Sequence, residues 1–266
     1  MKQINECVTN LYLKDEYINN NPSLHREDSL WKVSKIIPFV DMVIDKINKK
    51  EINLLDVGGG GGLILNKVSS HIEKKYGKKV NKYALDLSPG MLEIQRKENP
   101  DLKKALNESI INTSLDDREI DLALMIDILE HIPDPSDALI ELRRISRYVI
   151  FKVPLENNLC LTTKNFIKKG RPREKAIASI GHINFYTFGK VKGQIEKYLG
   201  KVIASSFTNA FDYFLQTKKA KGLMKLCYFT TASLTFKLSP RLCSLLFNDF
   251  AMILAKCYDS ESGYSK

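Results

Sequence analysis

The stretch NLLDVGGGGGLIL at residues 53–65 joins an apolar run that ends in an aspartate to five consecutive glycines. The apolar run predicts a buried β-strand, and the glycines predict a tight turn before the next helix. Glycine in an ordered element costs about 0.5–1 kcal/mol relative to alanine, so five glycines would cost roughly 2.5–5 kcal/mol. The net stability of a typical domain is only about 5–15 kcal/mol. We therefore expect a ligand to approach the backbone closely at this turn.

Around this turn, short apolar runs alternate with helix-length amphipathic runs, as a parallel sheet with crossover helices requires. The apolar runs are nearly continuous, which indicates a sheet covered by helices on both faces. We predict a Rossmann-like α/β fold with a mixed sheet of about seven strands and an antiparallel edge, an N-terminal helical segment and C-terminal inserts. The predicted strands are residues 52–57, 80–86, 121–126 and 147–153, a weaker one within 103–109, and two after an insert at 201–207 and 250–258.

Two helix starts can be read directly from the sequence. Ser88 precedes Pro89, and Asp134 precedes Pro135. Serine and aspartate are favoured N-caps, and proline is favoured at the first helical position, so we predict helices that begin at these two caps. Residues 155–187 are polar and basic without clear periodicity, and we predict a loop there.

The composition is that of an ordinary globular protein, with 44% hydrophobic and 27% charged residues among 266. The N-terminal residues carry charges where a signal peptide would be apolar, and no uninterrupted apolar run reaches the ~18 residues of a transmembrane helix. Five cysteines occur without a Cys-x-x-Cys pair, which argues against a zinc site and against a disulfide framework. We expect a cytoplasmic protein without a metal site. The formal net charge of +10 would suit an anionic partner, although a lysine-rich composition produces the same excess without one.

The spacing of the glycines distinguishes a dinucleotide-binding site from other cofactor sites that use a glycine-rich turn. The dinucleotide pattern G-x-G-x-x-G fits only in part, because its last position falls on Leu63, Ile64 or Leu65 wherever the pattern starts. The pattern that fits is Asp-x-Gly-x-Gly-x-Gly, formed by Asp56, Gly58, Gly60 and Gly62.

This segment resembles the first motif of the class I S-adenosylmethionine-dependent methyltransferases, in particular their small-molecule, glycan and lipid branches. The resemblance covers roughly residues 20–210 and keeps the order of the motifs. The other segments that carry it are YALDLSPGMLEIQRK, IDLALMIDILEHIPDPSDALIELRRI, RYVIFKVPLEN and GHINFYTFGKVKGQIEKYLG.

The resemblance implies S-adenosyl-L-methionine as cofactor and S-adenosyl-L-homocysteine as product. Asp56 and the glycine turn would hold the methionine end, and Asp86 would accept hydrogen bonds from the ribose hydroxyls, because an ionised carboxylate offers only acceptors. Leu87 and Met91 would pack on the adenine. Glu108 is our choice among residues 107–109 for the adenine amine.

Three further residues have a structural alternative beside the functional one. Asp127 would face the sulfonium end, or it would form a salt bridge at the strand end. His131 or His182 would take a proton from a hydroxyl acceptor, since histidine titrates near neutrality. Otherwise His131 belongs to an exposed helix-start pair, and His182 is a donor that stabilises a turn.

We also expect the chain to divide into three parts. Residues 1–50 would form a helical lid or cap that includes His25, Trp31 and Lys32; the alternative makes Trp31 a core anchor and leaves Lys32 in solvent. Residues 51–154 would form the S-adenosylmethionine-binding core. Residues 155–266 would hold the substrate-binding inserts and the last two strands.

We expect methyl transfer, by in-line displacement, to a small-molecule, glycan or lipid acceptor. The basic loop KKGRPREK favours an anionic acceptor, and the basic, apolar insert at 211–246 would either contact a membrane surface or form a helical subdomain with a solvated face. Nucleic acid is disfavoured, because the strand-four end reads DILE and not the Asn/Asp-Pro-Pro-aromatic sequence of related base methylases. A non-catalytic S-adenosylmethionine-binding partner or sensor is the alternative, and the glycine spacing disfavours an NAD-dependent oxidoreductase.

Overall fold

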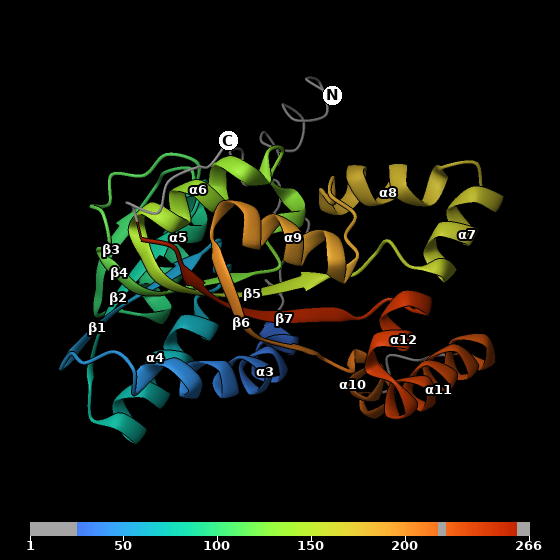
Figure 1. Ribbon diagram of the computed structural model, residues 1–266, viewed down its shortest axis with the longest axis horizontal. Helices are drawn as coiled ribbons and strands as arrows, with labels where there is room; N and C mark the ends of the chain where they lie inside the picture. Colours follow the sequence, from blue (N-terminus) through green and yellow to red (C-terminus); the bar gives the residue numbers. More distant parts are fainter. Residues whose placement is uncertain (1–25, 218–221, 260–266) are drawn as a thin grey trace.

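A seven-stranded mixed sheet forms the centre of the protein in the computed structural model, which describes residues 26–217 and 222–259 (Figure 1). The strand order is β3-β2-β1-β4-β5-β7-β6. The first five strands pair in parallel, and β7 runs antiparallel between β5 and β6. The predicted sheet is therefore confirmed. The strands are β1 (Glu51–Val57), β2 (Lys79–Leu85), β3 (Leu102–Leu106), β4 (Ile120–Ile126), β5 (Ser146–Pro154), β6 (Gly200–Phe207) and β7 (Phe250–Cys257).

Helices cover both faces of this sheet, with α3 and α4 on one side and α6 and α9 on the other (Figure 1). The predicted caps are present: Ser88 Oγ accepts a hydrogen bond from Met91 N at 3.0 Å, and Asp134 Oδ1 accepts one from Ser136 N at 3.1 Å. The helices around the sheet are α3 (Arg26–Ile44), α4 (Leu63–Tyr76), α5 (Pro89–Glu98), the short 3₁₀ helix η1 (Leu129–His131), α6 (Pro135–Ile145) and α9 (Phe188–Tyr198).

Helix α3 is part of the core. Ile36, Val40 and Val43 are fully buried in the same apolar cluster as residues of β1 and β4. Burying such side chains stabilises the fold by about 1.5–3 kcal/mol each. The part of the proposed lid that the structure describes is thus a packed helix, whereas His25 lies outside the described residues.

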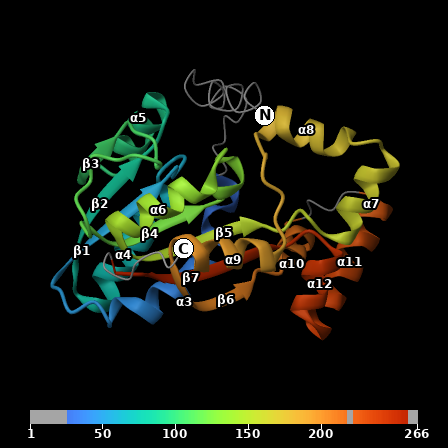
Figure 2. The same cartoon turned by 45° about the horizontal axis from the view of Figure 1, so that its top comes forward.

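The prediction of a loop at 155–187 is wrong over most of its length. Two helices, α7 (Leu159–Ile167) and α8 (Arg171–Ile180), occupy it and stand clear of the sheet (Figure 2). Neither helix buries a residue, and Gly170 and Pro172 at their junction are typical of loops, which is why the sequence suggests a loop here. The insert between β6 and β7 is helical and comprises α10 (Ala210–Gln216), α11 (Leu223–Leu238) and α12 (Pro240–Leu246).

Gly200, the first residue of β6, lies against the backbone of β7. We therefore expect a larger side chain at this position to lower the stability of the protein. A Cβ on Gly200 would lie 2.0 Å from the backbone oxygen of Lys256, so Gly200→Ala has to push the two strands apart. We expect the free energy of unfolding to fall by about 1–3 kcal/mol, as for an overpacked core. Urea unfolding would measure this change.

A matched control lies in α9. Nothing lies within 4 Å of a Cβ placed on Gly193, which is inside the helix. We expect Gly193→Ala to leave stability unchanged or raise it by up to about 1 kcal/mol, because alanine is the better helix former. Equal effects of the two substitutions would contradict the assigned contact between β6 and β7.

Candidate functional site

The turn after β1 leaves no room for side chains on its first two glycines. Gly58 has a left-handed φ of 61°, and a Cβ there would lie 2.3 Å from Ile128 Cδ1. A Cβ on Gly59 would lie 2.2 Å from Oδ2 of Asp56. The protein's own packing therefore requires part of the glycine run. The other two predicted glycines, Gly60 and Gly62, have φ values of 52° and 77°.

Asp56 is the second-last residue of β1, and its carboxylate lies against Gly59 of this turn. The side chain is fully buried, and neither carboxylate oxygen has a hydrogen-bond partner among the described residues. Burial, together with the charge of Asp86, raises the pKa of Asp56 to about 7. A buried carboxylate without a donor is unfavourable, so the position fits a ligand that brings a positive charge. The ammonium of S-adenosylmethionine is such a group.

Asp86 lies just beyond β2, beside the tip of β1. Its Oδ1 accepts a hydrogen bond from Ser88 N at 2.9 Å, and its Oδ2 lies 3.5 Å from Gln95 Nε2. Asn107 holds this strand tip, because its Nδ2 donates to the backbone oxygens of Asp86 and Leu87 at 3.0 and 2.9 Å. Buried carboxyl groups thus end two adjacent parallel strands, at the sheet edge where ligands bind in folds of this type.

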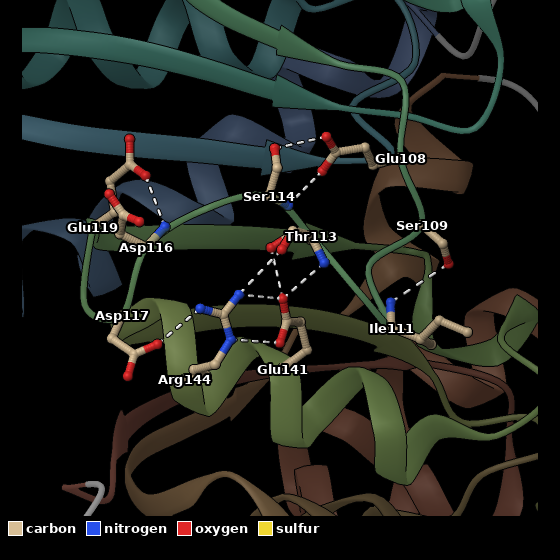
Figure 3. A network of polar contacts seen from close by, with 10 residues as sticks. All are labelled: Glu108, Ser109, Ile111, Thr113, Ser114, Asp116, Asp117, Glu119, Glu141 and Arg144. Atoms are coloured by element: carbon tan, nitrogen blue, oxygen red, sulfur yellow. Dashed lines mark hydrogen bonds and ion pairs between the residues drawn. The ribbon is translucent and has the colours of Figure 1, made fainter.

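The predicted adenine contacts lie at the same edge but are engaged within the protein. Met91 is buried in the first turn of α5, and Leu87 is half-buried. Glu108 follows β3, and both of its carboxylate oxygens accept from Ser114, at 2.8 Å from N and 2.7 Å from Oγ (Figure 3). The roles of these residues toward adenine stay predictions.

The loop that carries Glu108 is fixed to α6. Thr113 donates through N and Oγ to Glu141 Oε1 at 2.9 and 2.6 Å, and Arg144 pairs with the same carboxylate (Figure 3). This network anchors the loop between β3 and β4 to the second half of α6.

Asp127 follows β4 in the left-handed region, at φ 57°, which aspartate tolerates better than most residues. Its Oδ1 lies 2.6 Å from Lys152 Nζ of β5, and its Oδ2 lies 3.1 Å from Lys32 Nζ of α3. Burial opposes its charge, but the two lysines outweigh burial and hold the pKa of Asp127 well below its usual range. We call these three residues the Asp127 triad.

The triad is enclosed by aromatic rings. Lys152 Nζ lies 3.4 Å from the centre of the Phe250 ring and 5.7 Å from that of Trp31. Trp31 in turn stacks on Tyr213 of α10, with ring centres 4.9 Å apart. The alternative of a solvated Lys32 is wrong, because Lys32 is buried among these groups. The structure shows the strand-end salt bridge of Asp127, and its contact with the sulfonium end stays a prediction.

Beyond the triad, η1 and residues 181–187 enclose a second group of polar side chains. Glu130 is fully buried, and neither of its carboxylate oxygens has a hydrogen-bond partner in the described part of the chain. Burial and the charge of Asp127 raise its pKa. The backbone oxygen of Glu130 accepts hydrogen bonds from the N–H groups of Ile183 and Asn184, both at 3.0 Å, which fixes residues 181–187 against η1.

The two predicted bases meet in this enclosure. The rings of His131 and His182 have centres 4.8 Å apart. His131 Nδ1 lies 3.1 Å from the backbone oxygen of Gly181, and His182 Nδ1 lies 2.7 Å from Glu156 Oε2. Burial, followed by the neighbouring His182, lowers the pKa of His131 to about 4. The structure therefore brings together two histidines that lie 51 positions apart in the sequence.

Several residues of this site are not among those predicted from the sequence. Glu130 and Tyr186 stand beside predicted residues, and the Tyr186 hydroxyl is also buried without a partner among the described residues. The sequence does indicate a special role for Lys152, because a lysine inside the apolar strand VIFKVP needs a buried partner. Nothing in the sequence indicates such a role for Glu156.

The chain matches a family described as "Methyltransferase domain" over residues 55–148. No curated protein matches it. Among solved structures, it resembles geranyl diphosphate C-methyltransferase from Streptomyces coelicolor A3(2), with a TM-score of 0.55 and 10% identity over 82% of this chain and 79% of that chain. It also resembles the cyclopropane synthase MmaA2 from Mycobacterium tuberculosis, with a TM-score of 0.56 and 14% identity over 83% and 84% of the two chains.

A third structure of the same fold is the [4+2]-cyclase SpnF, with a TM-score of 0.52 and 11% identity over 83% of this chain and 80% of that chain. At these identities the structural likeness concerns the fold. The evidence for methyl transfer comes from the family match over residues 55–148. This range includes the glycine turn, Asp86 and η1.

Proposed function

We propose, from the premise that this chain is a class I S-adenosylmethionine-dependent methyltransferase, that it methylates a small molecule bound beside Glu130, His131 and His182. The observation that carries this proposal is that Asp56 on the cofactor side, and Glu130 and Tyr186 on the acceptor side, are buried without a hydrogen-bond partner for their carboxylate or hydroxyl oxygens among the described residues. Buried polar groups are normally hydrogen-bonded, so groups without partners mark the surfaces that ligands cover.

S-adenosylmethionine supplies an electrophilic methyl group on a sulfonium. The protein's contribution is to hold the cofactor and to orient the acceptor toward the methyl group. Asp56 would accept the ammonium and Asp86 the ribose hydroxyls, which fixes the cofactor at both ends. Positioning the reacting atoms about 3–3.5 Å apart contributes roughly 7–11 kcal/mol to lowering a barrier. Glu130 accepts hydrogen bonds when ionised and Tyr186 donates one, so together they suit an acceptor with a hydroxyl or amine.

The direct test is mass spectrometry of the purified protein, followed by calorimetry with S-adenosylmethionine. We expect a bound adenosyl ligand or micromolar affinity, and transfer of labelled methyl from the cofactor to a small molecule in a cell extract. Cofactor binding without any transfer would favour the alternative, a non-catalytic partner or sensor. No measurable cofactor affinity would contradict both.

The pKa of Asp56 predicts how cofactor affinity depends on pH. In the free protein Asp56 is protonated below a pH of about 7, and the neutral acid does not pair with an ammonium. Affinity should therefore fall by up to about tenfold for each pH unit below 7 and level off above it. Calorimetry between pH 5 and pH 8 measures this slope. His131, with a pKa of about 4, does not titrate in that range.

The control for this slope is Asp56→Asn, which keeps the shape of the side chain and removes its titration. We expect weak binding with a flat pH profile. A native protein with the same flat profile would show that Asp56 does not receive the ammonium.

We further propose that the acceptor is anionic or membrane-associated, from the surface that α7 and α8 present. A groove with a volume of about 760 Å³ lies on these helices. Phe166 and Ile167 beside it are 84% and 72% exposed, and Leu223 and Met224 at the start of α11 are 78% and 86% exposed. Apolar side chains next to cations are typical of helices that lie on anionic bilayers. The groove is lined by Lys164, Ile167, Lys168, Lys169, Arg171, Pro172 and Lys175.

None of the described helices combines the length and the hydrophobicity that a transmembrane span requires. Sedimentation with vesicles of anionic or zwitterionic lipid tests the surface contact. Each lysine near an anionic bilayer contributes about 1 kcal/mol, so the double variant Lys164→Gln/Lys168→Gln should bind anionic vesicles about 30-fold more weakly. Lys67→Gln, an exposed position on α4, is the control. If the native protein does not bind anionic vesicles, the membrane contact is rejected. The proposal is then an anionic acceptor that is free in solution.

A further inference from the structure

We infer that the outer side of α11 docks on the surface of an anionic lipid bilayer. This helix is apolar on both of its sides. Its inner side packs Phe229 and Phe236 against the cluster around Phe211. Its outer side carries Leu234 and Leu238, which are 57% and 87% exposed. A helix that is apolar all round is normally buried, either in the core of a large protein or in a membrane. The described part of the chain leaves the outer side of α11 uncovered.

The outward residues of α11 form one apolar stripe. Leu223, Cys227, Leu234 and Leu238 are all exposed, and they follow one another at intervals of 4, 7 and 4 positions. These intervals place the four side chains on one side of a helix. We call these four residues the α11 stripe. Soluble monomers rarely expose large apolar patches, and the patches that they do expose mark contacts with proteins or membranes.

The charge of this region selects a bilayer as the partner. None of the 31 acidic residues of the chain lies within residues 213–248, whereas six of its 41 basic residues do. The described cations among them, Lys225, Lys237 and Arg241, are all exposed. A second copy of the chain would bring like charges together around the stripe, which is unfavourable. An anionic bilayer offers an apolar interior to the leucines and negative charge to the cations.

The α11 stripe belongs to the same end of the molecule as the cationic groove. Helix α7, which carries part of the groove, contacts α12, and α12 contacts α11. Figure 2 shows these helices together, away from β1, β2 and β3. The groove would attract an anionic surface through charge, and the stripe would enter its apolar part. This contact does not depend on the proposed function, although a bilayer-bound enzyme would favour the membrane-associated acceptor proposed above.

Sedimentation with vesicles of phosphatidylserine and phosphatidylcholine tests the contact. The double variant Leu234→Gln/Leu238→Gln should bind about 30–100-fold more weakly than the native protein, because each leucine loses its transfer from water into lipid. The matched control is Met42→Gln/Ile140→Gln, which changes two exposed apolar positions on α3 and α6. We expect this control to bind as tightly as the native protein.

Salt separates the stripe from the groove. Charge attraction between exposed groups is largely screened at about 0.5 M salt, whereas transfer of apolar side chains is not. The loss in Lys164→Gln/Lys168→Gln should therefore disappear at high salt, and the loss in Leu234→Gln/Leu238→Gln should persist. A loss at the leucines that disappears with salt in the same way would overturn the inference.

Tryptophan emission shows whether the stripe enters the lipid. Trp31 is the one tryptophan of the chain, and it stacks on Tyr213 within the protein. Leu238→Trp adds a second tryptophan on the stripe. We expect lipids with brominated acyl chains to quench the emission added at position 238 and to leave the emission of the native protein unchanged. Equal emission from Leu238→Trp in brominated and ordinary lipid would contradict insertion.

The remaining outcomes separate this contact from other partners and from the proposed function. Native vesicle affinity in Leu234→Gln/Leu238→Gln would overturn the inference. A native dimer that this variant dissociates would also overturn it, because a second copy would then cover the stripe. Cofactor affinity is measured on the same samples. Binding of S-adenosylmethionine without binding of vesicles would reject the contact and leave the proposed function intact, and the reverse result would reject the function and leave the contact.

Discussion

Asp86→Ala should weaken binding of S-adenosylmethionine by about 10²–10⁴-fold. The predicted role of Asp86 is to accept two hydrogen bonds from the ribose, and each bond to a charged group contributes about 1.5–3 kcal/mol. Two such bonds give about 3–6 kcal/mol, and every 1.4 kcal/mol is tenfold in affinity. The buried position of Asp86 makes these bonds strong, because little water competes for the carboxylate. Calorimetry with the cofactor measures the change.

This substitution also touches the protein itself, so it needs a control at the same helix start. Asp86 Oδ1 accepts from Ser88 N, and Ser88 caps α5 through its own hydroxyl. Ser88→Ala removes the cap, which should lower stability by about 1 kcal/mol, and leaves the carboxylate of Asp86 in place. We expect cofactor affinity in Ser88→Ala to stay within a few-fold of the native value. Native affinity in Asp86→Ala would place the ribose elsewhere.

The sheet could be predicted because its signals are local. Each parallel strand is a short apolar run bounded by turns, and the two N-caps with their prolines are contiguous in sequence. Helices α7 and α8 were missed because Gly170 and Pro172 interrupt a short polar, basic segment, and these residues are typical of loops. The tips of β1 and β2 were predictable for a related reason: parallel neighbours end at the same edge, so Asp56 and Asp86 had to lie close together.

The rest of the site depends on contacts between distant segments. The Asp127 triad needs α3, β4 and β5 in their final positions, and the histidine pair needs residues 181–187 folded back onto η1. No spacing rule connects such positions. The sequence does show that Lys152 lies inside a strand predicted to be buried, where its ammonium needs an anionic partner. Asp127, directly after a strand, is one of the few positions that could supply that partner.

Asp127→Asn should lower the free energy of unfolding by about 3–5 kcal/mol, the cost of removing one partner from a buried ion pair. Lys152 is only 1% exposed, so its ammonium cannot turn to water when Asp127 loses its charge. Asparagine tolerates the left-handed backbone at this position nearly as well as aspartate, so the loss reports the charge. Because the folded-state pKa of Asp127 is depressed, its contribution is complete above pH 4 and disappears as the pH falls below it. Urea unfolding at pH 7 therefore measures the whole effect.

A double-mutant cycle separates this charge effect from a change in packing. Lys152→Met keeps an apolar stem between Trp31 and Phe250 and leaves Asp127 its ion pair with Lys32, so it should be milder than Asp127→Asn. The double variant Asp127→Asn/Lys152→Met removes both charges, and we expect it to be more stable than Asp127→Asn alone, since the uncompensated ammonium is gone. Strictly additive losses would show that the two side chains stabilise the protein independently. In that case the triad would not be the link that holds α3 against the ends of β4 and β5.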